Sequence, residues 1–62
     1  MKVREVIRLL ERDGWEEVRQ KGSHRHYRHR VKPGTVTVAG HLRNDLHPKT
    51  EGSILREAGL KR

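Results

Sequence analysis

The feature that most restricts this chain is that 62 residues must fold without a single cysteine. Chains of this size bury only roughly 60% of the surface that their unfolded form exposes, and many compensate with disulfides or metal sites. Here neither a disulfide framework nor a thiolate zinc site is available. The fold must therefore rest on packing alone, and we expect a single domain over residues 1–62.

Hydrophobic periodicity predicts a helix near each end of the chain. Apolar residues recur with helical spacing over residues 2–13, and Gly14 is suited to end that helix. A second helix is expected to begin at Thr50, a good N-cap residue, and to end at Gly59. The expected core is mostly aliphatic: Val3, Val6, Ile7, Leu9, Leu10, Trp15, Val18, Tyr27, Val36, Val38, Ile54, Leu55, Ala58 and Leu60.

Three short strands are expected between these helices, over residues 15–20, 24–30 and 35–38. In the first strand Val18 is expected to face the core, and in the second the alternation of side chains places Tyr27 on the core side. Turns that contain glycine join the strands. The order of elements predicts an α+β fold with a meandering, three-stranded antiparallel sheet and both helices on one face.

The net charge of +7 is concentrated in the middle of the chain. No Asp or Glu occurs between Val18 and Asn44, whereas many basic residues do: Arg19, Lys21, Arg25, Arg28, Arg30, Lys32 and Arg43. Such a patch favours a polyanion as partner, because the release of condensed counterions supplies affinity without any reading of sequence. The alternative is that these charges only solubilise the surface.

The sequence gives no indication of a membrane segment. No apolar run approaches the roughly 18 residues of a membrane span, and the charged start from Met1 to Glu5 lacks the apolar stretch of a signal peptide. We therefore expect a cytoplasmic protein without membrane contact.

The histidines are the residues best suited to acid–base catalysis, and the chain has five of them. His24 lies inside the basic stretch and follows Gly22 and Ser23 directly. RNA carries its own nucleophile, the 2′-hydroxyl, so a nuclease needs only a base for that proton and cations for the phosphate. A glycine turn lets phosphate approach the backbone, and Ser23 adds a donor. From these residues alone, His24 is either catalytic, or a surface histidine, or one that contacts RNA.

The other histidines have simpler interpretations. His29 is expected to pack beside Tyr27, and His47, next to a proline, is expected in a loop. His24 and His26 share a strand face, but no carboxylate or cysteine lies near them to complete a tetrahedral zinc site. We therefore expect neither a metal ion nor another cofactor.

Several motifs resemble the HicA (YcfA-like) mRNA interferase toxins, and the resemblance covers nearly the whole chain. The most specific is Gly22-Ser23-His24 at its distance from the first helix, together with the ending Ser53–Leu60. Further matches are Gly14-Trp15, Arg19, Tyr27, Val36-Thr37-Val38-Ala39, His41 and Thr50.

This resemblance implies a fold similar to the double-stranded-RNA-binding domain and metal-independent endonucleolytic cleavage of mRNA. It assigns the catalytic role to His24. The RNA-binding residues expected around it are Lys21, Gly22, Ser23, Arg25 and Arg28. The second catalytic group is left open between His26, His41 and a lysine. The resemblance also implies a HicB-type antitoxin that blocks the site, and contact with DNA only through that antitoxin.

Two other functions fit the same residues. A non-catalytic RNA-binding module would use the basic patch for shape-based contact with RNA and would be indifferent to His24. A structural protein of a ribonucleoprotein particle, or an adaptor that binds another protein, is also compatible with the composition.

Overall fold

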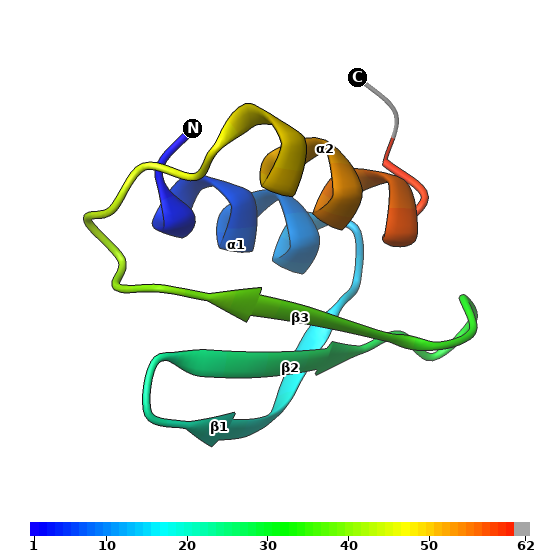
Figure 1. Cartoon of the computed structure of the whole chain (residues 1–62). Coiled ribbons are helices and arrows are strands. Elements are labelled where there is room, and N and C mark those ends of the chain that lie inside the picture. Colours follow the sequence, from blue (N-terminus) through cyan, green and yellow to red (C-terminus); the bar gives the residue numbers. More distant parts are fainter. Residues whose placement is uncertain (61–62) are drawn as a thin grey trace.

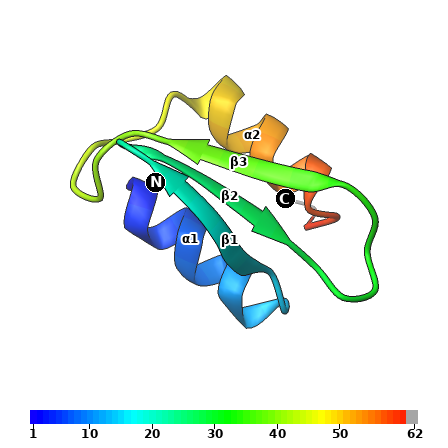
Figure 2. The same cartoon turned by 90° about the horizontal axis from the view of Figure 1, so that it is seen from below.

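The computed structural model describes residues 1–60, which form two helices and one antiparallel sheet (Figure 1). The elements are α1 (Val3–Arg12), β1 (Glu16–Lys21), β2 (His24–Arg28), β3 (Thr35–Ala39) and α2 (Pro48–Glu57). The strands lie in the order β1-β2-β3, and both helices cover the same face of the sheet (Figures 1 and 2). This architecture confirms the predicted α+β fold. The last two residues of the expected domain, 61–62, lie outside the described residues.

The core fills the space between the two helices and the sheet, as expected. Its buried apolar residues are Val3, Val6, Ile7, Leu10, Trp15, Tyr27, Val36, Val38, Ile54, Leu55 and Ala58. Leu9 and Leu60 pack against the margin of this cluster. The one wrong expectation is Val18, whose side chain is 56% exposed.

A β-bulge in β1 explains the exposure of Val18. Glu17 pairs with Tyr27 and Arg19 pairs with His26, so the register shifts by one residue between Glu17 and Arg19. Val18 is the extra residue of this bulge, and its side chain is left outside the core. Strict alternation would have placed Trp15 and Lys21 on the same face. The bulge instead lets Trp15 point into the core while the end of the strand presents Lys21 to solvent.

The loop between β3 and α2 caps the start of α1. The first N–H groups of a helix have no partner within the helix. Here the N–H of Val3 donates to the carbonyl of Asn44 at 2.8 Å, and that of Arg4 donates to the carbonyl of Leu42 at 3.2 Å. The start of α1 is thus satisfied by a segment that is distant in the sequence.

α2 begins earlier than the sequence predicted. Its N-cap is His47, whose Nδ1 accepts a hydrogen bond from the N–H of Lys49 at 3.1 Å, and Pro48 occupies the first turn. The prediction of Thr50 as N-cap is therefore wrong, because the histidine and the following proline already define the start. Neither α1 nor α2, the helices of the described part, is long and apolar enough to cross a membrane.

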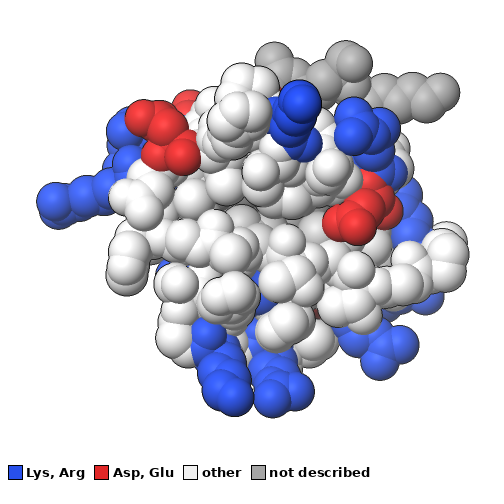
Figure 3. Space-filling model, in the orientation of Figure 1, with Lys and Arg blue, Asp and Glu red and all other residues white. Residues whose placement is uncertain are grey.

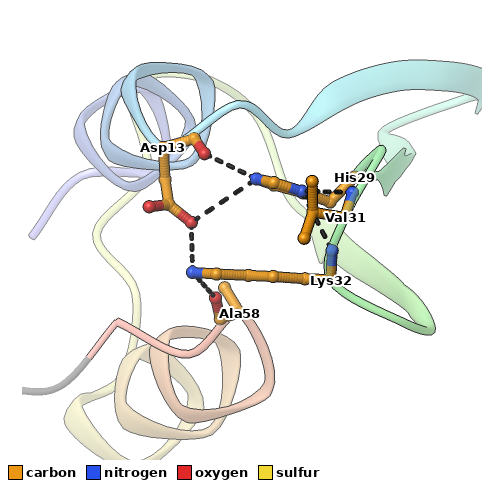
Figure 4. Close-up of polar contacts among 5 residues, drawn as sticks. All are labelled: Asp13, His29, Val31, Lys32 and Ala58. Carbon is orange, nitrogen blue, oxygen red and sulfur yellow. Dashed lines mark hydrogen bonds and ion pairs between the residues drawn. The ribbon is translucent and has the colours of Figure 1, made fainter.

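A polar cluster ties the β2–β3 loop to the C-terminal ends of both helices (Figure 4). The Lys32 ammonium donates to the carboxylate of Asp13 after α1 and, at 2.9 Å, to the carbonyl of Ala58 after α2. The Nδ1 atom of His29 accepts from the N–H groups of Val31 and Lys32, so its proton is on Nε2 and donates to the Asp13 carbonyl at 2.6 Å. His29 is therefore a structural residue, as expected.

Replacing Val18 by Thr should change the free energy of unfolding by less than about 0.5 kcal/mol, because the side chain is exposed. The same change at the buried Val38 should cost about 1–3 kcal/mol, because it buries a hydroxyl. Urea unfolding of both variants measures the difference. Equal losses would show that Val18 packs into the core and that the bulge is absent in solution.

The Asp13–Lys32 pair should make stability depend on pH. The hydrogen bond from Lys32 holds the pKa of the Asp13 carboxyl below its ordinary value. A lowered pKa in the folded state stabilises the fold above the pKa of the unfolded chain, about 3.9, and this stabilisation is lost as pH falls through the folded value. Asp13→Asn should therefore lower Tm at pH 7, and the difference from the parent should vanish in acid. A difference independent of pH would exclude the charge of Asp13 as its cause.

Candidate functional site

The face of the sheet opposite the helices carries three of the expected site residues, Lys21, His24 and Arg28. Residues that lie directly across a sheet project on the same side. The outer face therefore consists of three rows across the strands: His24 between Lys21 and Ala39, His26 between Arg19 and Thr37, and Arg28 between Glu16 and Thr35.

Cations dominate this outer face. Blue Lys and Arg side chains project from the sheet side of the molecule, at the bottom of the view in Figure 3. Within the three rows, Glu16 is the acidic residue, and it lies opposite Arg28 at the end of β2 farthest from the β1–β2 turn. The rows of His24 and His26 carry Lys21 and Arg19. The positive potential is thus concentrated toward the turn.

The β1–β2 turn leaves its backbone open to an approaching ligand. It consists of Gly22, with φ of 60°, and Ser23, the arrangement of a type II′ hairpin turn with glycine first. A Cβ atom added to Gly22 would meet nothing within 4 Å, so the space beside it is free. The carbonyl of Ser23 accepts the N–H of Gly40 at 3.1 Å, which fixes the turn to the end of β3.

A recess lies beside this turn and is lined by Lys21, Gly22, His24 and His26. His24 is exposed, whereas His26 is partly buried, and its Nδ1 atom lies 3.0 Å from the Thr37 hydroxyl. The recess thus brings together two histidines, a lysine and an open stretch of backbone. This combination can hold a phosphate and exchange protons with it.

Arg25 lies on the other face of the sheet, toward the helices. Its Nη1 atom donates to the Gly40 carbonyl at 3.2 Å, its Nε atom lies 3.9 Å from the Glu17 carboxylate, and its side chain is 14% exposed. The guanidinium thus stabilises the position of Gly40, whose N–H in turn bonds to the carbonyl of Ser23. The other expected RNA-binding residues lie at the turn or, like Arg28, on the outer face.

Arg19 is a residue of the outer face that the expected site did not include. It lies directly opposite His26 and is exposed. The signal available in the sequence was its place two residues before Lys21, which puts both on one face of β1. The remaining histidines do not line the recess: His41 follows Gly40 in the loop after β3, His47 lies at the start of α2, and His29 belongs to the polar cluster.

No group of three or more His, Cys, Asp or Glu residues that could hold a metal ion occurs in residues 1–60. The two imidazoles that line the recess can accept and donate protons.

Comparison with known families gives a match over nearly the whole chain. The family model described as the HicA toxin of bacterial toxin–antitoxin matches residues 3–60, which include every element of the fold and all the residues of the recess. A search among curated proteins finds no match.

The open backbone at Gly22 gives a test of whether RNA binds at the recess. Gly22→Ala should lower the free energy of unfolding by about 1–2 kcal/mol, because an L residue is strained at positive φ. Gly34→Ala is the matched control, since Gly34 also has positive φ and open space beside it but lies in the β2–β3 loop. Titration of a labelled RNA should show weaker binding for Gly22→Ala alone. Equal binding by both folded variants would place the RNA elsewhere.

Proposed function

The chain belongs to the HicA toxin family of toxin–antitoxin systems, and from this premise we propose that it is a metal-independent endoribonuclease that cleaves mRNA. We assign the role of general base or acid to His24, and the whole of residues 1–62 to one toxin domain. The observation that carries this proposal is the recess, where the exposed His24 lies beside Lys21 and the open backbone of Gly22.

The residues of the recess match the needs of RNA cleavage. The 2′-hydroxyl attacks the adjacent phosphorus, which requires removal of its proton and stabilisation of the charge that develops on the phosphate. The exposed imidazole of His24 can take the proton, because histidine is the side chain that most readily exchanges protons under physiological conditions. Lys21, which also lines the recess, supplies a cation beside it.

We propose that phosphate contacts come from Lys21, Gly22, Ser23 and Arg28. Lys21 and Gly22 line the recess, Ser23 completes the turn, and Arg28 lies two rows away along β2, where it meets a neighbouring phosphate. Arg25, included from the sequence, contributes through its bond to the Gly40 carbonyl, which supports the turn, and not through the exposed face.

A toxin of a toxin–antitoxin system has an antitoxin as its partner. We propose that this partner is of the HicB type, that the complex forms in the cytoplasm, and that an acidic surface of the antitoxin covers the cationic face around His24. Contact with DNA would then come from the antitoxin. The charge of the outer face supports this assignment, because electrostatic complementarity accelerates association and selects partners.

The proposal predicts that the purified chain cleaves a long unstructured RNA in excess EDTA and that His24→Ala does not. His47→Asn is a matched control, because it removes a histidine far from the recess and keeps a side-chain acceptor at the start of α2. Products are resolved on a denaturing gel. Loss of a general acid–base residue should slow cleavage by about 10²–10⁴-fold, while binding on a native gel is retained.

Cleavage by His24→Ala at the parent rate would exclude the assigned role of His24. If the parent retards RNA but leaves it intact, the chain is a non-catalytic RNA-binding module. In that case Arg28→Gln should reduce the slope of log affinity against log salt by about 0.7, the contribution of one single-strand phosphate contact.

A further inference from the structure

We propose that His26 is the second catalytic group of the recess and that it protonates the leaving 5′-oxygen while His24 removes the proton from the 2′-hydroxyl. This inference rests on the proposed function, and it assigns different roles to the two histidines. The sequence left the second catalytic group open between His26, His41 and a lysine. The position of His26 in the structure selects it among these residues.

The two imidazoles lie on one face of β2 and beside the same recess. His24 and His26 lie two residues apart on β2, so their Cα atoms are separated by about 7 Å and their side chains project on the same side. Both line the recess. His29 bonds to Asp13, and His47 caps α2. His41 follows Gly40, which is bonded to the turn at Ser23, but His41 is not among the residues that line the recess.

Thr37 holds the ring of His26 in a way that suits proton transfer. Its hydroxyl lies 3.0 Å from Nδ1, so Nε2 remains for the substrate. A hydroxyl both donates and accepts hydrogen bonds. It can therefore accept from the Nδ1–H of a protonated His26 and can bond to either tautomer of the neutral ring. The imidazole keeps its orientation before and after it gives up a proton.

The charged surroundings of His26 favour an anionic ligand beside it. The charged and titratable groups on this face are Arg19, Lys21 and Glu16 from β1, and His24 and Arg28 from β2, while β3 contributes none. Glu16 lies opposite Arg28, one row farther from the turn. The residues directly across from His26 are Arg19 and Thr37, so a phosphate over this row meets a guanidinium and no carboxylate.

The proposed step is balanced without an added reactant. The bond between O2′ and phosphorus forms as the bond between phosphorus and O5′ breaks. The proton of the 2′-hydroxyl passes to the neutral His24, and Nε2–H of the protonated His26 passes its proton to O5′. The products are a 2′,3′-cyclic phosphate and a 5′-hydroxyl, and protons exchanged with water restore both histidines.

An RNA with a better leaving group distinguishes a general acid from a general base, because only the role of the acid becomes unnecessary. The test uses a short RNA that contains one linkage cut in the long RNA, and the same RNA with sulfur in place of the bridging 5′-oxygen. A thiolate leaves without protonation, since the pKa of a thiol is about 8.5 and far below that of an alcohol. His26→Ala should cleave the oxygen substrate about 10²–10⁴-fold more slowly than the parent and the sulfur substrate within a few-fold of it.

His24→Ala should be impaired on both substrates, because the proton of the 2′-hydroxyl must be removed in either case. His47→Asn should behave as the parent on both. Thr37→Val should show a smaller loss on the oxygen substrate and the same recovery on sulfur, whereas Thr37→Ser should retain the parent rate. Circular dichroism establishes that each variant is folded.

Two outcomes overturn the inference alone: His26→Ala cleaves the oxygen substrate at the parent rate, or it loses the same factor on both substrates while the parent remains active. Failure of the parent to cleave either RNA overturns the proposed function, and the role of His26 with it.

Discussion

The bulge at Val18 is the constraint on which the arrangement of β1 depends. A strand presents alternate side chains to opposite faces, so a tryptophan at its entrance and a lysine six residues later would share a face in a regular strand. One extra residue reverses this relation between Trp15 and Lys21. The core gains its largest side chain, and the outer face gains Arg19 and Lys21 beside the two histidines of β2. Core and site are thus set by the same irregularity.

Much of the fold could be predicted because its elements follow simple periodicities. The helical spacing near Val3, the alternation around Val36 and the glycines at the ends of elements located both helices and all three strands. Two details could not be predicted. Val18 looked like a core residue because nothing local distinguishes a bulge from a regular strand, and Thr50 looked like an N-cap because histidine is an uncommon one.

The site could be predicted in outline. What the prediction missed depends, like the exposure of Val18, on which face of its strand each side chain occupies. The resemblance singled out His24, and the structure places it in a recess with Lys21 and Gly22. Its assigned role remains a prediction. Arg25 was grouped with them because it is adjacent in sequence, although adjacent residues of a strand face opposite ways. Arg19 was omitted because its place opposite His26 depends on the register of β1, which the bulge sets.

The bulge in β1 also affects how this strand can pair with other molecules. β1 lies at an edge of the sheet, where unpaired backbone groups offer a template for strands of other molecules. An extra residue at Val18 interrupts the regular spacing of those groups and increases the local twist. The charges of Glu16, Glu17, Arg19 and Lys21 add to this barrier. At this edge of the sheet, the residue that sets the direction of Arg19 and Lys21 therefore also disfavours pairing with a strand of another molecule.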